Sequence, residues 1–182
     1  IGAVDFTGDM PVILGVDGPS LGGFVCPCVV VKAELWKLGQ LKAGDRVRFI
    51  PISQAQSDQL EWAQLDQPEL DLDALYHPVL TAELDTLDSA ILATLPAADT
   101  PKVVYRAAGD NYVLVEYGEG VLDLNLRFRV HALMQSITQS IQQADIQGII
   151  DLTPAIRSLQ VHYDANVISL DQLMQRLRQL EA

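Results

Sequence analysis

The 182-residue chain carries 24 acidic and 12 basic residues, a net charge of −12 that repels polyanions and argues against a nucleic-acid partner. Hydrophobic residues make up 49% of the chain, enough for a core, yet no apolar run reaches the roughly 20 residues that cross a bilayer. Together with the lack of a signal-peptide pattern, this predicts a cytoplasmic protein without membrane partners. Because the first residue is Ile1 rather than methionine, we expect the chain to be part of a longer polypeptide.

Residues 1–53 are predicted to be rich in β-strands. The runs "PVIL" and "FVCPCVVV" are short, apolar and bounded by Gly and Pro, and "DRVRFIPI" alternates charged with apolar positions. Between them, "AELWKLGQLKAGD" predicts one or two helical turns followed by a turn at "KAGD". These strands are too few to enclose a core, so we expect a partial sheet or one completed by strands from elsewhere.

Cys26 and Cys28 flank Pro27, and residues two apart rarely reach disulfide geometry. We interpret them as free thiols, buried on a strand in a protein of a reducing compartment. Two thiols and three dispersed histidines do not form the paired motifs of a zinc site, so no metal is expected.

Residues 54–100 are predicted to be an acidic linker, since they contain ten Asp and Glu, no Lys or Arg, and three prolines. One helix is possible within the linker, because some apolar residues keep helical spacing: Leu80, Leu84, Leu87, Ile91 and Leu95.

Residues 101–182 are predicted to form a compact unit with the element order β-β-α-β-β-α. Two strands surround the turn "AAGDN", and a long helix follows on the apolar stripe Leu122, Leu126, Val130, Leu133, Ile137 and Ile141. Two more strands come next, in "IQGIIDLTPAIRSLQVHYD", and a last helix is capped by Ser169 with Gln172 three residues on. This order predicts an α+β domain, a sheet with helices on one face.

Two stretches resemble known families. "GAVDFTGDMPVILGVDGPSLGGFVCP", with "AELWKLGQLKAGDRVRFIP", is similar to the last part of the allophanate hydrolase subunit 2 family. "YRAAGDNYVLVEYGE", "LDLNLRFRVHAL" and "GIIDLTPAIRSLQVHYD" are similar to the N-terminal domain of the subunit 1 family. That order occurs in the carboxyltransferase region of urea carboxylase and urea amidolyase. The resemblance therefore implies an incomplete cyclophilin-like β-barrel in 1–53, a linker in 54–100 and a small sandwich domain in 101–182.

The resemblance also implies a function. Such a region transfers the carboxyl group from carboxybiotin to urea, giving allophanate, while a biotin carboxylase domain uses ATP and bicarbonate and a biotin carrier domain holds the cofactor. These domains would be partners within the same polypeptide. The chain itself has neither a phosphate-binding G-x-x-x-x-G-K-[ST] pattern nor a biotin-attachment motif, so we expect it to bind no cofactor and to be inactive alone.

The Gly- and Pro-rich stretch from Gly8 to Pro27 is the candidate binding loop. Carboxylates and backbone amides suit a planar amide and a carboxylate, which points to Asp9, Asp17, Ser20, Gly22 and Gly23. Arg157 is a further candidate, since a guanidinium can orient a carboxylate. The alternative is structural: the loop as a plain crossover with turns, and Arg157 as a surface or interdomain pair.

Three alternatives in function stay open at this point. The same families supply accessory subunits of an ATP-dependent 5-oxoprolinase and a regulatory module that binds a sensor kinase. Guanidine also remains a possible substrate in place of urea, because no residue singled out in the sequence distinguishes NH from O.

Overall fold

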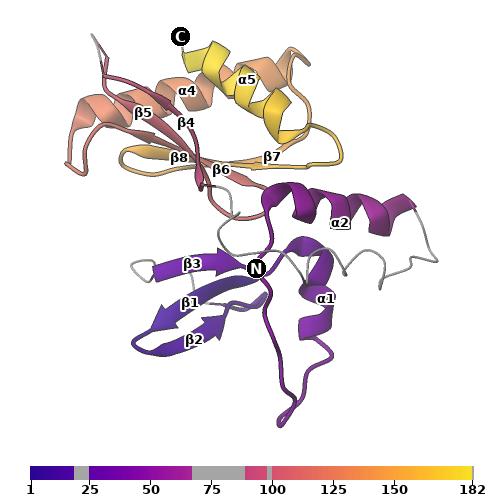
Figure 1. Ribbon diagram of the computed structural model, residues 1–182. Helices are drawn as coiled ribbons and strands as arrows, with labels where there is room; N and C mark the ends of the chain where they lie inside the picture. The colour runs from indigo at the N-terminus through magenta and orange to yellow at the C-terminus, as the bar shows by residue number, and fades with distance from the viewer. Residues whose placement is uncertain (19–24, 67–88, 98–99, 182) are drawn as a thin grey trace. The chain divides into compact units, whose positions relative to one another are not determined.

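The computed structural model describes residues 1–18, 25–66, 89–97 and 100–181, and the chain divides into unit 1, Ile1–Asp88, and unit 2, Ser89–Ala182 (Figure 1). Each unit contains one antiparallel sheet together with helices, so the predicted α+β class is confirmed. The described residues form no closed barrel, and the incomplete barrel expected for unit 1 stays a prediction.

Unit 1 is built on a three-stranded sheet of order β2-β1-β3. Its strands are β1 (Ala3–Thr7), β2 (Met10–Ile13) and β3 (Val25–Val29), and its helices are η1 (Lys32–Glu34), α1 (Leu35–Leu38) and α2 (Gln54–Asp66). An ion pair between Lys32 and Glu61 joins η1 to α2. The predicted strands at "PVIL" and "FVCPCVVV" and the short helix at "AELWKLGQ" are therefore confirmed, whereas α2 occupies the start of the stretch predicted to be a linker.

Two expectations for unit 1 are wrong. Residues 45–52 form no strand, although their alternation predicted one. Alternation shows that a segment can pair, but a strand forms only where a neighbour supplies hydrogen bonds, and no strand in the described part of unit 1 lies beside this segment. Cys26 and Cys28 lie on β3 as free thiols, as predicted, but both are exposed rather than buried.

Unit 2 contains a five-stranded antiparallel sheet of order β4-β5-β6-β8-β7. The strands are β4 (Ile91–Leu95), β5 (Val103–Ala107), β6 (Tyr112–Tyr117), β7 (Ile149–Pro154) and β8 (Ser158–Tyr163), and the helices are α4 (Leu124–Gln142) and α5 (Leu170–Glu181). The predicted order β-β-α-β-β-α is confirmed for 103–181, with β4 added in front of it.

The helix expected along Leu80–Leu95 is wrong over its last seven residues, 89–95, none of which is helical. Ile91–Leu95 form β4, which pairs with β5 from Ile91↔Arg106 to Leu95↔Val103. The apolar side chains at these positions also suit a strand, and the edge of the sheet in unit 2 supplies the hydrogen bonds that decide between the two forms. The rest of that expected helix, before residue 89, lies outside the described residues.

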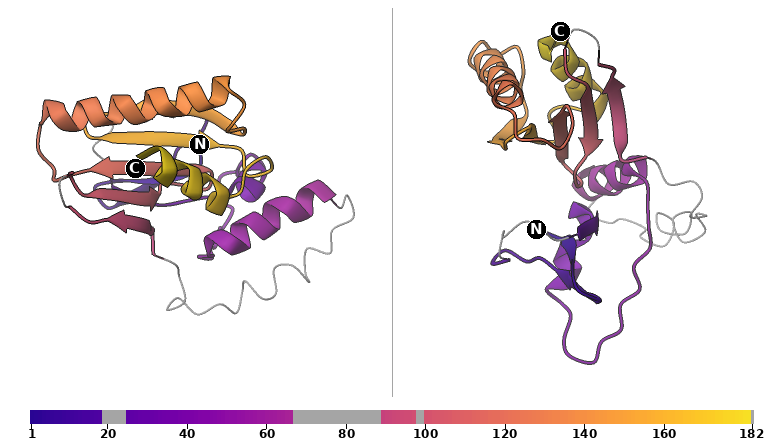
Figure 2. Two further views of the ribbon diagram at one scale, coloured as in Figure 1. Left: turned by 90° about the horizontal axis from the view of Figure 1, so that it is seen from above. Right: turned by 90° about the vertical axis from the view of Figure 1, so that its left-hand side faces the viewer.

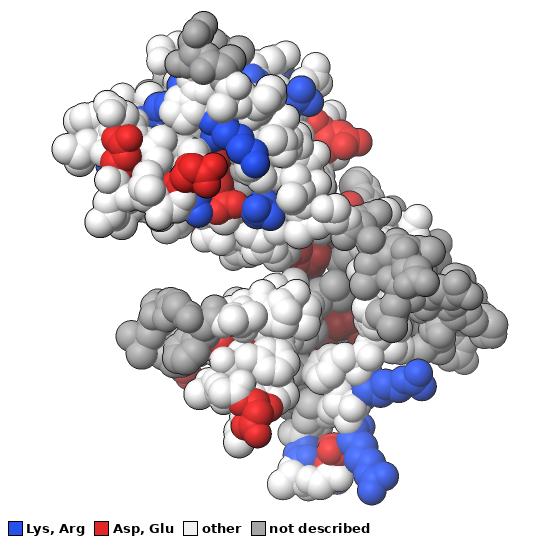
Figure 3. Space-filling view, turned by 60° about the vertical axis from the view of Figure 1, so that its left-hand side comes forward, with Lys and Arg blue, Asp and Glu red and all other residues white. Residues whose placement is uncertain are grey.

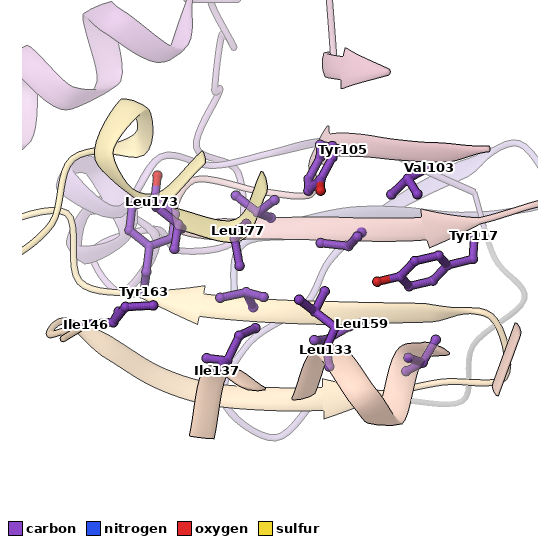
Figure 4. Packing of buried hydrophobic residues seen from close by; sticks show 14 of the residues in the cluster. Val103, Tyr105, Tyr117, Leu133, Ile137, Ile146, Leu159, Tyr163, Leu173 and Leu177 are labelled. Carbon is purple, nitrogen blue, oxygen red and sulfur yellow. The ribbon is translucent and has the colours of Figure 1, made fainter. Parts of the chain in front are cut away.

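The core of unit 2 lies between one face of its sheet and the two helices, which lie side by side on that face (Figure 2). Alternate residues of the central strands face the helices and are fully buried, among them Tyr105, Tyr117 and Leu159 (Figure 4). Leu173 and Leu177 of α5 close the core from the other side. Burying this much apolar surface makes unit 2 a domain with its own core.

The apolar stripe predicted for the long helix is right in its middle and wrong at its ends. Leu126, Val130, Leu133 and Ile137 are buried, but Leu122 is 84% exposed and Ile141 is 39% exposed. Leu122 precedes the helix, because Asp123 is its N-cap and accepts a hydrogen bond from the Asn125 amide.

The predicted cap of α5 is confirmed. Ser169 Oγ accepts from the Gln172 amide, and Gln172 Oε1 accepts from the Ser169 amide, which is the reciprocal pattern of a capping box. Neither α5 nor any other helix in the described ranges is long and apolar enough to cross a membrane.

Candidate functional site

The candidate loop begins at the turn between β1 and β2. Thr7 pairs with Met10, so Gly8 and Asp9 form a two-residue turn. Gly8 has φ +68° while Asp9 does not have a positive φ, the combination of a type II′ hairpin turn, whose first position favours glycine. Asp9 is exposed at the tip of this turn. The local backbone thus explains why glycine precedes Asp9, and it leaves the Asp9 carboxylate facing solvent.

A second turn holds Asp17. The Gly18 amide donates to the Gly15 carbonyl over 3.1 Å, which places Val16 and Asp17 at the exposed centre of a tight turn. A Cβ atom at Gly18 would lie 3.1 Å from both the Gly15 oxygen and the Leu14 Cβ, so a larger residue would press on the turn. Ser20, Gly22 and Gly23 lie outside the described residues.

The two predicted aspartates are not brought together. Met10–Ile13 run as a strand, and the Leu14 amide continues the pairing by donating to Ala3. Because a strand advances about 3.3 Å per residue, the turn of Asp9 and the turn of Asp17 lie at opposite ends of β2. They are two separate carboxylates of the hairpin rather than one paired acidic site.

Asp5 is a candidate that the sequence analysis missed. It lies in the middle of β1, is 6% exposed, and its Oδ1 has no hydrogen-bond partner in the part of the chain that the structure describes. A buried carboxylate oxygen without a donor is costly, so such an atom is expected to meet a donor in the working protein. The signal in the sequence is a lone acidic residue inside the apolar strand "AVDF".

Arg157 lies in unit 2, directly before β8, in a cluster with Glu116 and Arg106. Arg157 Nη2 donates to Glu116 Oε1 over 3.1 Å, and Arg106 Nε donates to the other oxygen of the same carboxylate. All three side chains are partly exposed. The carboxylate is shared between two guanidinium groups, so the cluster carries one net positive charge. Arg157 is held in place by Glu116 and keeps donors for an anionic group.

Arg106, Glu116 and the Tyr112–His162 pair alternate with the buried residues of their strands, so they lie on the sheet face opposite the helices. The rings of Tyr112 and His162 stack with centroids 4.2 Å apart and planes 13° apart. On the side of unit 2 that Figure 3 shows, acidic and basic side chains lie next to one another in small groups, and uncharged surface surrounds these groups. The other histidine of unit 2, His131, is exposed on α4, 3.2 Å from the Gln135 amide nitrogen. In the described ranges, no three or more His, Cys, Asp or Glu side chains are grouped to hold a metal ion.

Comparison with known protein families gives one match inside each of the two units. Residues 1–51 match the family described as carboxyltransferase domain, subdomain A and B. Residues 103–182 match the family described as carboxyltransferase domain, subdomain C and D. The hairpin with Asp5, Asp9 and Asp17 falls in the first match, and the Glu116 cluster falls in the second.

Comparison with individual proteins gives matches along nearly the whole chain. It is 42% identical over 181 residues to the urea amidolyase of Lachancea kluyveri and 39% identical over 180 residues to that of Saccharomyces cerevisiae, in each case over 97% of this chain. The crystal structure of the K. lactis urea amidolyase matches with a TM-score of 0.76 at 40% identity, over 99% of this chain and 11% of that one. The chain spans 10% of the length of the two curated relatives.

Proposed function

Because this chain belongs with the carboxyltransferase regions of urea amidolyases and urea carboxylases, we propose that it forms part of the site where a carboxyl group is transferred to a nitrogen of urea. The observation that carries the proposal is the unbroken similarity across both units, 42% identity over 181 residues. If this chain were an accessory subunit of a 5-oxoprolinase or a kinase-binding module, we would expect the two families on separate polypeptides. Here they follow one another in one chain, which supports the carboxylase.

In this proposal the chain is one part of a longer polypeptide. A biotin carboxylase domain uses ATP and bicarbonate, and a biotin carrier domain brings carboxybiotin, which supplies the carboxyl group. The Oδ1 of Asp5, which has no hydrogen-bond partner among the described residues, suits this chemistry, because an acceptor without a donor fits an N–H of urea or of a ureido ring. The residues of this chain then bind and orient urea, which receives the carboxyl group, and take up the proton that urea loses.

Binding urea through its NH₂ groups requires hydrogen-bond acceptors, and carboxylates are suitable ones. Urea is planar and weakly nucleophilic, and each of its NH₂ groups donates hydrogen bonds, so a carboxylate of unit 1 can orient it. The candidates are the buried Asp5 and, as separate alternatives at the two ends of β2, Asp9 and Asp17. As the urea nitrogen bonds the carboxyl carbon, the bond between that carbon and the ureido nitrogen of carboxybiotin would break. A carboxylate can accept the proton that the urea nitrogen loses, and the released ureido nitrogen would take up one proton in its place. The amides around Ser20, Gly22 and Gly23 would hold an oxyanion, and Arg157 would pair with a carboxylate.

The test uses the full-length polypeptide, with two activities measured in the same preparation. Asp5→Asn, Asp17→Asn and Gly22→Ala should each lower urea-dependent carboxylation on the order of 10²-fold, the usual effect of losing one oriented hydrogen bond at a transition state. Biotin-dependent ATP cleavage, which belongs to another domain, should stay within about twofold of the parent. The matched control is Asp45→Asn, an exposed aspartate of unit 1 in the turn at Lys42.

Two results would contradict the proposal. If all three variants melt at lower temperature but transfer carboxyl groups normally once folded, Asp5 and the candidate loop have structural roles and do not form a site. If the full-length protein carboxylates guanidine but not urea, the reaction type stands and the substrate assignment is wrong.

A further inference from the structure

An exposed apolar patch lies at the beginning of α4. We define the α4 patch as the five side chains Val121, Leu122, Leu124, Phe128 and Ile156, which are 54–84% exposed. The first four are close in sequence, and Leu124 and Phe128 are one helical turn apart. Ile156 joins them because Arg127 Nη1 donates to the Ala155 carbonyl over 3.0 Å, which holds the β7–β8 turn against the first turns of α4. The patch is thus one surface rather than scattered residues.

The patch does not belong to the core of unit 2. The side of α4 that packs on the sheet is formed by Leu126, Val130, Leu133 and Ile137, and at 100° per residue Leu124 and Phe128 point the opposite way. Farther along the same outward side, the residues are polar: Gln135, Gln139 and Gln142. An outward helix face that is apolar only in its first two turns is typical of a surface that meets another protein surface.

We propose that the α4 patch is covered by another domain of the same polypeptide. The inference rests on the proposed function, in which this chain is one region of a carboxylase whose relatives are about ten times longer. Charged residues of both signs border the patch, the exposed Glu119 and Asp123 and the partly exposed Arg127, so the covering surface should have an apolar centre and a charged edge. Most of the relatives' length lies outside this chain, which makes a covering domain in the same polypeptide the occupant to test.

The experiment compares hydroxyl-radical footprinting of the 182-residue chain with that of the full-length polypeptide, read by mass spectrometry at single residues. Phe128 is 68% exposed in this chain, and a buried side chain keeps less than about a tenth of its area exposed. Oxidation of Phe128 and Leu124 should therefore be about tenfold slower in the full-length protein. Sedimentation should show the 182-residue chain as a monomer at the same concentration.

Two lysine variants of the full-length protein provide the matched comparison. Phe128→Lys and Gln139→Lys place the same residue on the same outward side of one helix, inside and outside the patch. Amide exchange in the first two turns of α4 should rise to the rate of the 182-residue chain in Phe128→Lys and stay slow in Gln139→Lys.

Equal oxidation of Phe128 in both proteins would overturn the inference. So would protection in the 182-residue chain that increases with its concentration, because the occupant would then be a second copy. Footprinting does not depend on catalytic turnover. If Phe128 is protected in a full-length protein that does not carboxylate urea, the proposed function is wrong and the inference about the α4 patch stands.

Discussion

At the scale of single residues, one polar group inside the core of unit 2 is fully paired and one is not. The Tyr117 hydroxyl donates to Glu181, whose other oxygen accepts from Arg129, and the Arg129 guanidinium lies 5.6 Å from the centre of the Tyr117 ring. Tyr105 is also fully buried, but its hydroxyl has no partner among the described residues. The same side-chain type therefore contributes differently at the two positions.

Replacing each tyrosine by phenylalanine should separate these contributions. Tyr105→Phe removes an unpaired buried hydroxyl without changing the shape of the ring, so the free energy of unfolding should stay the same or rise by up to about 1 kcal/mol. Tyr117→Phe removes a hydrogen bond to a carboxylate and should lower it by about 1.5–3 kcal/mol. Urea denaturation followed by circular dichroism measures both. Equal losses in the two variants would show that Tyr105 has a partner.

Burial also links Tyr105 to pH. Desolvation and, after it, the negative charge of Glu181 raise the pKa of Tyr105 from 10.0 to about 12, while burial and the hydrogen bond to Glu181 raise the pKa of Tyr117. A raised pKa means that the folded state favours the neutral phenol. Its contribution to stability is complete below pH 10 and is lost as pH rises from 10 to 12, because the unfolded chain ionises first.

Alkaline titration of stability should show this coupling. Between pH 10 and 12 the stability of Tyr105→Phe should fall less steeply than that of the parent chain, by up to about 1.4 kcal/mol per pH unit, the effect of one proton. The measurement is the urea midpoint at several pH values. Parallel curves for the two proteins would mean that the Tyr105 hydroxyl ionises as readily in the folded state as in the unfolded one.

At the scale of secondary structure, α4 ends at a residue in an unfavourable conformation. Ala144, just after the C-cap, has φ 61°, and the Asp145 amide donates to the Ser140 carbonyl over 2.9 Å, as in helix ends that normally carry glycine. A left-handed conformation costs an L-residue other than glycine about 1–2 kcal/mol. Replacing it by glycine removes this strain, but part of the gain is lost because glycine makes the unfolded chain more flexible. Four residues on, Gly148 has φ +83° and no room for a Cβ atom, which would lie 2.8 Å from Ile168 Cγ2.

Exchanging the two residue types should therefore have opposite effects. Ala144→Gly should raise the free energy of unfolding by about 0.5–1 kcal/mol, and Gly148→Ala should lower it by about 2 kcal/mol or more, since both strain and a clash oppose it. Thermal melting of the 182-residue chain compares the two directly. A destabilised Ala144→Gly would indicate that the alanine methyl group makes a contact that outweighs its backbone strain.

The elements that could be predicted from sequence are those whose partners lie nearby in the chain. The alternation of Val113, Val115 and Tyr117 and the capping pair Ser169–Gln172 both concern neighbours a few residues apart, and the structure agrees with them. Residues 45–52 and Ile91–Leu95 depended on which distant strand was available, and there the pattern alone was insufficient.

The candidate site follows the same rule. The turns that hold Asp9 and Asp17 are marked by adjacent glycines, so they could be located in the sequence. Their separation by the length of β2, the burial of Asp5 and the pairing of Arg157 with Glu116 depend on tertiary contacts that no local pattern records.

At the scale of the whole chain, the two units differ in how much apolar surface they bury. The core of unit 2 includes three fully or almost fully buried tyrosines and the inner sides of two helices. Among the described residues of unit 1, the buried apolar side chains are Ala33 and Leu60, whereas Met10, Val25, Trp36 and Phe49 are 57–69% exposed. A sheet that buries so little apolar surface gains little stability from it, and its outer strands β2 and β3 each have one unpaired edge.

This difference predicts separate stabilities for the two units of the 182-residue chain. Backbone amides of β5, β6 and β8 should exchange with solvent only through global unfolding of unit 2, while those of β1–β3 should exchange at least about 10³-fold faster, through local opening that costs several kcal/mol less. Peptide-resolved hydrogen exchange at neutral pH measures both sets in one sample. If β1 exchanged as slowly as β6 in the isolated chain, the small core of unit 1 would be sufficient by itself. If β1 became protected only in the full-length polypeptide, the exposed apolar side chains of its sheet would be surfaces that the rest of that polypeptide covers.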